Sequence, residues 1–480
     1  MLYSTPKTGL FIFLSVLLIL VQAGMAATQT TTLKDQQSVA ITIYNSNIGL
    51  VKETRLVHLQ QGVQALKFMD VAGKIDPTTV KLNSLLDGTS LRILEQNYEY
   101  DLANQQKLVE KFVGQKVELA WSNPESKKEE MVEATLLSTQ GGNTFQIGDK
   151  IFLGHPGRII LSKIPETVSL QPTLLWLLEN RLSGPQRLEV MYLTSGINWK
   201  TDYLTVLNSS DTQVELTGWV TIENRSGAAY RNAQLRLVAG EAQRVRQEKM
   251  MERAAPRMAG EGLPSMAAAP QFKEESFFEY HLYALDRGTT LQDNETKQMV
   301  LFDAHQVPVS RLFILQGQPQ FYWSRYEAKG QKQKVGVFLE LVNRQENHLG
   351  IPLPKGTVRV YKADKDGTLQ FAGEDWVDHT AKNERFKIKI GEAFDVAAER
   401  IQTEYKHLDS KIYEVAFEVE LRNQKSEDVR VLMEEPIPGD WEMISNSHPY
   451  EKLQANLIRF LVPVEKNQAV KVKYKVRFRY

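Results

Sequence analysis

The 480-residue chain contains no cysteine. This absence excludes disulfides, cysteine-ligated metals and a lipid anchor attached through a thioether. A chain of this length without disulfides has to be held together by its apolar core. Apolar residues make up 42% of the sequence and charged residues 24%, which is the composition of globular proteins with several domains.

The chain also lacks net charge, because Lys and Arg together number 58 and Asp and Glu together also number 58. Without a global electric field a protein does not attract nucleic acid or an anionic membrane surface. We therefore expect no nucleic-acid partner.

The motifs of common catalytic sites are missing. The sequence has no G-x-S-x-G, no P-loop, no H-E-x-x-H and no G-x-G-x-x-G, so the usual nucleophile, phosphate, zinc and dinucleotide sites are not expected. Its eight histidines never stand two or four residues apart, which argues against a locally built metal site. We predict no cofactor and no metal.

Long apolar runs are confined to the first residues. Lys7 precedes an unbroken apolar run from Leu10 to Val21, and small residues follow up to Ala26. This order is typical of a secretory signal peptide, so we expect residues 1–26 to be removed and the protein to be periplasmic or secreted. The run is short for a membrane span, which needs about 20 apolar residues, although a retained anchor is the alternative. No integral membrane span is expected after signal removal.

What the sequence does contain is alternation of apolar and polar residues, which predicts β-strands. We expect an all-β, multidomain antiparallel β-sandwich with Ig-like modules. Residues 38–100 are predicted as an N-terminal β domain, with a hairpin turn at Gln61-Gly62. Residues 101–163 are predicted as a small insert of one helix and a β-barrel, and residues 164–480 as C-terminal β-sandwich domains.

Two features recur or stand out in the C-terminal part. Three alternating strands end at an asparagine in a polar loop, namely Asn224, Asn343 and Asn423. Asparagine suits such a position because its side chain caps backbone groups and tolerates the left-handed conformation. Residues 247–273 are rich in Ala, Met, Pro and Gly without any period, which predicts a disordered loop or a Met-rich docking segment.

Three short stretches are candidates for chemistry. The stretch Asp364-Lys365-Asp366-Gly367 resembles half a calcium loop, but strands on both sides favour a hairpin. Asp375, Asp378 and His379 lie in GEDWVDHTAKNE, and if they converged they could perform acid–base catalysis. We regard them as weak catalytic candidates, because a polar loop with hydrogen-bonded carboxylates explains them better. The aromatic stretch FYWSRYEA is interpreted as core rather than as a sugar-stacking platform.

The final stretch, VKVKYKVRFRY, places five cations on one face of a strand. Such a ladder could bind an acidic partner, form the last strand of an outer-membrane barrel or be neutralised inside the fold. The stretch KIYEVAFEVELRN has glutamates in the matching phase, so we predict that residues 413–421 pair with, or lie one strand from, residues 470–480. The basic stretch FKIKIGE, preceded by Arg385 and containing Lys387 and Lys389, is a second strand that could flank this acidic one.

Several stretches together resemble a known family. YNSNIGLVKETRLVHLQQGVQALKFMDVAGKIDPTTVKL is similar to the N-terminal β module of the mucoidy inhibitor family of exported bacterial proteins. LTGWVTIENRSGAAYRNAQLRLVAGE and GEAFDVAAER are similar to its long C-terminal domain of unknown function. Long members carry a coiled coil between these parts, whereas this chain has residues 101–163 instead and resembles a shorter branch. The resemblance implies an exported β-sandwich protein and brings no catalytic residues.

These observations favour an exported envelope protein without enzymatic activity that binds or scaffolds other envelope proteins or surface polymers. The alternative is a cell-envelope hydrolase or polysaccharide-active enzyme that uses the Asp375–His379 region. A deep pocket that gathers Asp378, His379 and another carboxylate would favour the enzyme.

Overall fold

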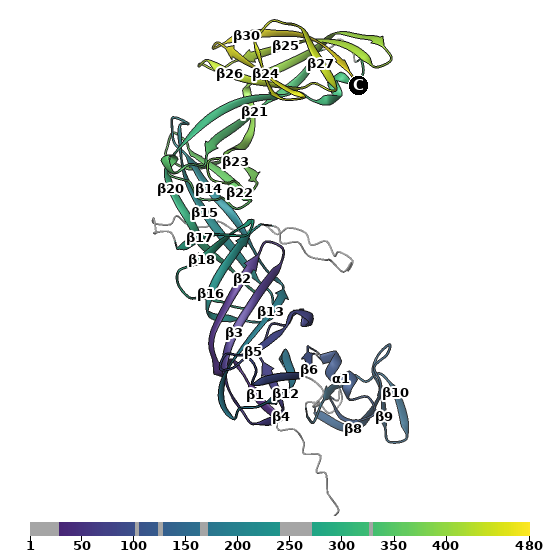
Figure 1. Cartoon of the computed structure of the whole chain (residues 1–480). Coiled ribbons are helices and arrows are strands. Elements are labelled where there is room, and N and C mark those ends of the chain that lie inside the picture. Colours follow the sequence, from purple (N-terminus) through teal and green to yellow (C-terminus); the bar gives the residue numbers. More distant parts are fainter. Residues whose placement is uncertain (1–27, 101–104, 123–127, 164–170, 241–270, 326–329) are drawn as a thin grey trace, which may run out of the picture. The chain divides into compact units, whose positions relative to one another are not determined.

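The computed structural model describes residues 28–100, 105–122, 128–163, 171–240, 271–325 and 330–480. These residues form thirty strands in four sheets and a single α-helix (Figure 1), which confirms the all-β class. The four 3-10 helices are η1 (Leu33–Asp35), η2 (Pro77–Thr79), η3 (Pro319–Tyr322) and η4 (Gln345–Asn347). No helix in the described part of the chain is long and apolar enough to cross a membrane.

Two of the predicted segments fall on residues that the structure does not describe. The predicted signal peptide, residues 1–26, lies outside the described residues. Most of the predicted loop, residues 247–270, lies outside them as well. The end of that loop was predicted wrongly, because Phe272 and Lys273 already belong to strand β17.

The chain divides into two compact units, each assembled from separated stretches of sequence. The first comprises the described residues up to 35 together with 55–71 and 83–188. The second comprises residues 36–54, 72–82 and 189–480. The sequence boundaries at residues 100 and 163 stay predictions.

A four-stranded sheet contains the first strand of the chain. Its order is β1 (Thr28–Thr31), β4 (Gly62–Met69), β12 (Thr173–Asn180) and β6 (Leu91–Glu99). The chain leaves β3 and enters this sheet at Gly62, whose φ of +102° suits glycine. The hairpin predicted at Gln61-Gly62 is wrong, because β4 pairs with β1 and β12 rather than with β3.

The insert consists of one helix and a five-stranded sheet. The helix is α1 (Gln105–Lys111), and the sheet order is β10 (Lys150–Leu153), β9 (Thr144–Ile147), β8 (Glu129–Ser138), β7 (Lys116–Ser122) and β11 (Arg158–Ile160). The predicted apolar face of the helix packs as expected, since Val109 and Phe112 join the buried cluster around Leu119 and Leu136. The barrel prediction is wrong, because β10 and β11 are the two ends of an open sheet.

An eight-stranded sheet joins strands from distant parts of the sequence. Its members are β17 (Phe272–Phe277), β18 (Tyr280–Leu285), β16 (Tyr230–Ala239), β2 (Gln36–Tyr44), β3 (Ile48–Leu59), β13 (Gly184–Ser195), β5 (Lys81–Ser84) and β19 (Thr289–Leu291). Strand β2 pairs parallel with β16, with Ile41 opposite Leu235. The prediction of antiparallel sheets holds for most of the pairs that the described residues form, whereas β1–β4, β2–β16, β14–β22 and β20–β26 are parallel.

The largest assembly has thirteen strands and lies in the second unit. Its main order is β23 (Leu369–Val377), β22 (Gly356–Ala363), β14 (Ile197–Leu207), β15 (Gln213–Asn224), β20 (Glu295–Gln316), β21 (Gln331–Val342), β24 (Arg385–Asp409), β25 (Ile412–Asn423), β30 (Gln468–Arg479) and β27 (Asp440–Asn446). Three further strands complete it, namely β26 (Val429–Pro436), β28 (Tyr450–Gln454) and β29 (Leu457–Val464).

The C-terminal strands form a sandwich around one apolar core. Strands β24, β25 and β30 form one layer, and β26 and β29 lie against it with their inward residues buried. Along β25, burial alternates strictly from Val415 to Leu421, as the sequence pattern predicts. Each fully buried aliphatic or aromatic side chain contributes about 1.5–3 kcal/mol relative to exposure, so this cluster dominates the stability of the sandwich.

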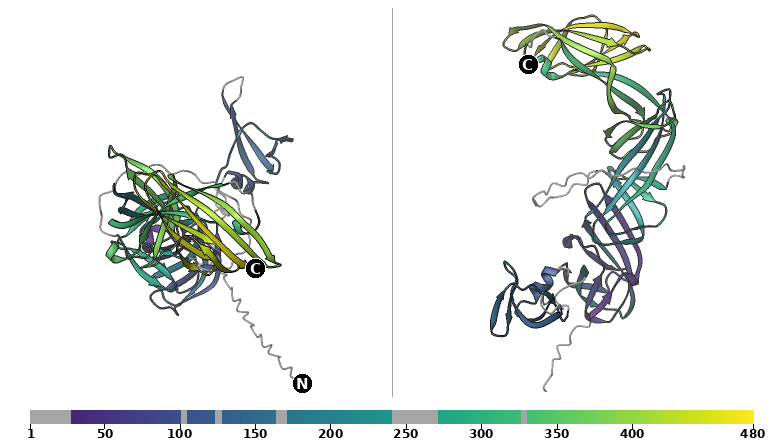
Figure 2. Two further views of the ribbon diagram at one scale, coloured as in Figure 1. Left: turned by 90° about the horizontal axis from the view of Figure 1, so that it is seen from above. Right: turned by 180° about the vertical axis from the view of Figure 1, so that it is seen from behind.

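Strands β20 and β24 are long because each takes part in two ladders. Residues of β20 up to Pro308 pair with β15, and those from Val309 pair with β21 (Figures 1 and 2). In β24, a bulge interrupts the ladder with β21. It lies between the pairs Lys334–Ala397 and Gly336–Glu392, where a single residue of β21 stands opposite four residues of β24. A bulge of this kind redirects side chains.

The three recurring asparagines are buried and tie their loops to a second segment. The Nδ2 of Asn423 donates to the carbonyl oxygens of Glu427, Val464 and Glu465 at 2.9–3.2 Å, and its Oδ1 accepts from the backbone N–H of Lys425. Asn224 and Asn343 make the same kind of contacts, to Gln292 and to Ala381 respectively. The predicted capping role is confirmed. None of the three adopts the left-handed conformation.

Replacing Asn423 with alanine should lower the free energy of unfolding by about 3 kcal/mol, because it leaves several buried backbone groups without a partner. The matched control is Asn446→Ala, since Asn446 is exposed and its amide makes a single bond to the carbonyl of His448. Urea unfolding followed by tryptophan fluorescence measures both. Equal losses in the two variants would contradict a locking role for Asn423.

Candidate functional site

The acidic stretch that the sequence singled out lies at the end of β23 and in the turn after it. In β23, Glu374 pairs with Arg359 of β22, with 3.2 Å between Oε2 and Nε. Asp375 accepts hydrogen bonds from two backbone N–H groups, that of Trp376 at 2.8 Å and that of Lys389 at 2.7 Å. Asp375 therefore fastens β24 beside β23.

The remaining members of the stretch organise the turn. Asp378 Oδ1 accepts from the backbone N–H of His379 at 2.8 Å. The Nδ1 of His379 accepts from the backbone N–H of Lys355 at 3.2 Å. Glu384 Oε2 accepts from the backbone N–H of Ala381 at 3.2 Å. Each side chain thus faces a different backbone group.

None of these groups lines the hollow that adjoins the end of β23. The hollow is lined by Tyr203, Leu216, Leu353, Val358, Val377 and Phe386, with no carboxylate or imidazole among them. Within the described ranges no group of three or more His, Asp and Glu side chains is placed to hold a metal ion. The hydrogen bonds of Asp378, His379 and Glu384 to backbone N–H groups hold this turn in place.

The stretch that resembles half a calcium loop forms a hairpin between β22 and β23, as predicted. Asp364 Oδ1 accepts from the backbone N–H groups of Asp366 and Thr368, both at 3.0 Å, and Gly367 has a φ of +82°. These bonds hold the pKa of the Asp364 carboxyl below its ordinary value, with the bond from Gln370 as the largest cause.

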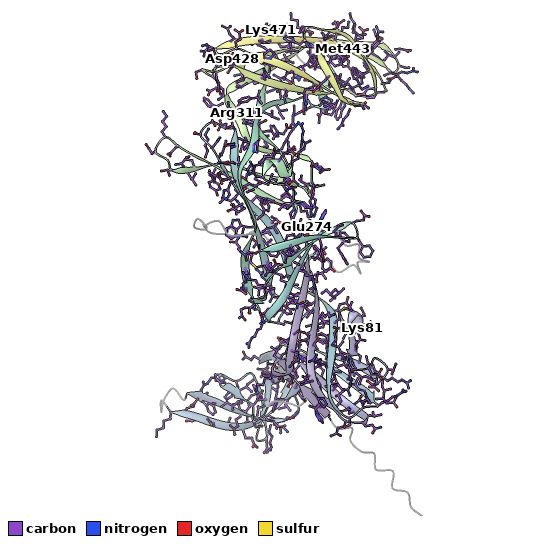
Figure 3. The ribbon with its side chains drawn as sticks, turned by 60° about the vertical axis from the view of Figure 1, so that its left-hand side comes forward. Lys81, Glu274, Arg311, Asp428, Met443 and Lys471 are labelled. Atoms are coloured by element: carbon purple, nitrogen blue, oxygen red, sulfur yellow. The ribbon has the colours of Figure 1, made fainter. Side chains whose placement is uncertain are left out.

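Four of the five cations of the last strand form ion pairs with glutamates of the neighbouring strand. Strand β30 pairs antiparallel with β25 and places Lys473 opposite Glu418, which confirms the predicted pairing of 413–421 with 470–480. Glu418 binds Lys471 at 2.7 Å and Lys473 at 3.0 Å on the outer face of the sheet, where Figure 3 labels Lys471. Glu414 binds Lys475 at 2.8 Å and Arg477 at 2.6 Å.

These contacts shift the titration of both partners. Hydrogen bonds from Lys475 and Arg477 hold the pKa of Glu414 below its ordinary value, and those from Lys471 and Lys473 do the same for Glu418. The bond to Glu418 raises the pKa of Lys471 in turn. The ladder is therefore part of the sheet rather than a free site for an acidic ligand.

The second basic stretch, 385–391, pairs elsewhere. It lies in the first part of β24 and pairs with β21, where Arg385 and Lys387 approach Glu340 at 3.5 and 4.0 Å. The acidic strand β25 pairs instead with the second part of β24. The idea that 385–391 flanks the acidic strand is wrong, because Glu340 offers an equivalent partner.

The aromatic stretch 321–326 divides between core and surface. Tyr322 is fully buried in the sandwich core and Phe321 packs against it, as predicted. Trp323 is 60% exposed, which the core interpretation did not predict, and Tyr326 lies outside the described residues.

Tyr322 belongs to a polar network buried in the sandwich. Arg400 of β24 and Glu435 of β26 form an ion pair whose side chains are both fully buried. Arg400 Nη1 also donates to Tyr474 Oη at 2.8 Å, and Tyr322 Oη donates to Glu435 at 3.3 Å. Burial lowers the pKa of Arg400, but the charge of Glu435 outweighs it and the pKa rises. Burial raises the pKa values of both tyrosines.

Sequence reasoning missed this network, although a signal was present. Arg400 stands in phase with Val396 and Ala398, which point inward along β24. A charged residue in phase with an apolar row is a candidate for a buried ion pair, because a buried charge needs a partner.

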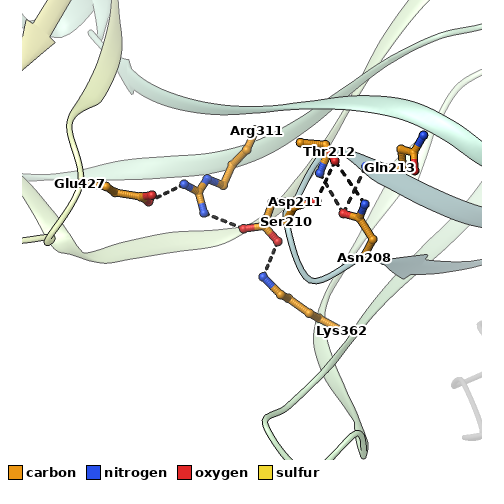
Figure 4. Close-up of polar contacts among 8 residues, drawn as sticks. All are labelled: Asn208, Ser210, Asp211, Thr212, Gln213, Arg311, Lys362 and Glu427. Atoms are coloured by element: carbon orange, nitrogen blue, oxygen red, sulfur yellow. Dashed lines mark hydrogen bonds and ion pairs between the residues drawn. The ribbon is translucent and has the colours of Figure 1, made fainter.

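A second missed cluster centres on Asp211, in the turn between β14 and β15 (Figure 4). Its carboxylate binds Arg311 of β20 at 2.6 Å and also Lys362 of β22, and Arg311 reaches Glu427 at 2.5 Å. Asp211 adopts a positive φ of 57°, which aspartate tolerates in a turn. Two acids and two bases neutralise each other here, so the cluster fastens the turn to three other elements.

Comparison with known proteins adds one match. A family model described as a domain of unknown function, DUF4139, matches residues 188–480. No curated protein matches the chain.

The charge ladder should make stability depend on pH. Glu418 has a lowered pKa in the fold, so its contribution is present above the ordinary carboxyl pKa of about 4.3 and is lost as pH falls through the lowered value. Glu418→Gln should lower stability by about 1 kcal/mol at neutral pH, with the gap closing under acid conditions. Melting temperatures across pH measure it. The exposed Glu442→Gln serves as the control, and a gap independent of pH would contradict the assignment.

The buried ion pair should be costly to break on one side. Glu435→Gln leaves the Arg400 charge buried without its counter-ion and should lower the free energy of unfolding by about 3–5 kcal/mol. Arg400→Met combined with Glu435→Leu should lose far less, because no charge is then buried. Chemical unfolding compares both with Arg422→Ala, which removes a partly exposed ion pair. A double variant as unstable as Glu435→Gln would refute this account.

Proposed function

This chain belongs to the DUF4139 family, and we propose that it is an exported envelope protein that binds or scaffolds other envelope proteins or surface polymers without catalysis. One observation carries the proposal. Asp375, Asp378 and His379, the side chains that could perform acid–base chemistry, each bind a separate backbone group. Catalysis needs such groups to converge on one reacting atom.

Exposed aromatic side chains near the same strands support a binding role. Phe394, in the bulge of β24, is 98% exposed, and Phe371 and Trp376 of β23 are more than half exposed. The bulge is held on both sides, because Ala393 packs against the core and Val396 is buried. Aromatic side chains dominate the energetics of protein interfaces, so these residues are suitable anchors for a partner.

Export is proposed from the first residues of the sequence. Lys7, the apolar run from Leu10 to Val21 and the small residues up to Ala26 fit a signal peptide. The absence of cysteine agrees with a chain that folds in the bacterial periplasm without disulfides. We propose a periplasmic or secreted location, with cleavage near Ala26.

The finer family assignment is also a proposal. We infer that the chain represents a short branch of the mucoidy inhibitor family, because the matching stretches occur in the same order before and within residues 188–480. In place of a coiled coil, the chain has the insert built from α1 and strands β7 to β11. The name of that family does not transfer an activity to this chain.

Cross-linking in intact cells tests the proposed function. A photoreactive phenylalanine analogue at Phe394 should capture a defined envelope component, whereas the same probe at the exposed Leu453 should not. The adduct should persist in a chain that also carries Asp378→Asn and His379→Ala. N-terminal sequencing of the periplasmic protein should show the loss of residues 1–26.

Two results would contradict the proposal. One is the absence of any specific adduct at Phe394 together with turnover of an envelope polymer by the purified protein. The other is loss of that turnover in the Asp378→Asn, His379→Ala variant at an unchanged melting temperature, which would favour the hydrolase.

A further inference from the structure

Strand β10 presents an apolar edge to solvent. All four of its residues are exposed, with Ile151 at 65% and Leu153 at 88%. It pairs with β9 on one side and ends the five-stranded sheet on the other, with no further strand beside it among the described residues. An exposed apolar edge strand is a template for pairing with another strand.

The hydrogen-bond pattern shows which backbone groups are available at this edge. The N–H of Gly154 donates to the carbonyl of Asn143 at 2.9 Å, in register with the pairs Phe152–Phe145 and Lys150–Ile147. Successive residues of an antiparallel strand direct their polar groups to opposite edges. The N–H and C=O groups of Ile151 and Leu153 therefore point away from β9.

We propose that β10 pairs antiparallel with β10 of a second copy of this chain, with Phe152 opposite the same residue of the other copy. In this register Ile151 of each copy lies opposite Leu153 of the other copy. All the outward backbone groups of both residues are then used, which gives four hydrogen bonds around a two-fold axis. The inference does not depend on the proposed function.

The side chains fit this register. The two Ile151 and two Leu153 side chains form one apolar cluster on one face of the joined sheet, and the two Phe152 rings meet on the other. Lys150 lies opposite Gly154, so no like charges oppose each other. Registers centred on Ile151 or Leu153 lose hydrogen bonds or place an apolar side chain opposite Asp149 or His155.

The absence of cysteine allows a sharp test, because an introduced cysteine is the only thiol in the chain. In the Phe152→Cys variant, the cysteines of the two copies lie opposite each other in a non-hydrogen-bonded pair. The Cβ atoms of such a pair approach closely enough for a disulfide. Lys150→Cys is the matched control, since it lies on the same strand and face but about 13 Å from its counterpart. The experiment uses the whole chain as processed by the cell, oxidised mildly with diamide. The yield of disulfide-linked dimer should be at least about tenfold higher for Phe152→Cys than for the control.

A second measurement does not depend on the cysteine variants folding or pairing. Light scattering of the unmodified chain should give the mass of a dimer, and Ile151→Lys should shift it to a monomer with an unchanged circular dichroism spectrum. An unmodified chain that stays monomeric at its highest soluble concentration overturns the proposal. Equal linking at positions 150 and 152 overturns it too, as does a Phe152→Cys adduct formed only with a different protein.

Discussion

The buried ion pair between Arg400 and Glu435 constrains how the two layers of the C-terminal sandwich can pair. The two side chains come from β24 and β26, so the pair joins the layers of the sandwich, and Tyr322 and Tyr474 complete its hydrogen bonds. The guanidinium also lies over the rings of Phe321 and Phe417. A slip of either strand would bury two unpaired charges, at a cost of several kcal/mol each. This cost restricts the sandwich to one register.

Polar side chains elsewhere in the molecule serve the same purpose. Asn224, Asn343 and Asn423 fasten loops, Asp211 fastens a turn, and Asp375 fastens two strands. A long chain with many strands and no disulfides has many turns to hold, and buried or partly buried polar groups hold them by accepting or donating several bonds at once. The acidic stretch around His379 is an instance of this use, because its side chains accept hydrogen bonds from backbone groups of the turn.

Local patterns predicted much of the fold and little of the candidate site. Alternation of apolar and polar residues identified the strands. The matched phase of Glu418 and Lys473 identified the pairing of β25 with β30. Both patterns can be recognised within the sequence of a single strand. The partner of residues 385–391 could not be predicted from charge, since Glu340 is as suitable as the glutamates of β25. The parallel pair β2–β16 joins distant residues that no local signal connects. The phase of Arg400 marks it as a buried charge, but no local signal identifies Glu435 as its partner.

The acidic row of β25 has a consequence for the order of folding. Strand β30 lies between β25 and β27 although it follows β25 by more than forty residues. Until it arrives, one edge of β25 stays open, and pairings over such a sequence distance form slowly. An open edge invites pairing with the same strand of another chain, but in a parallel, in-register pairing Glu414, Glu418 and Glu420 would face identical glutamates, which disfavours that pairing. The row that later neutralises the cations of β30 thus first protects the unfinished sandwich from aggregation.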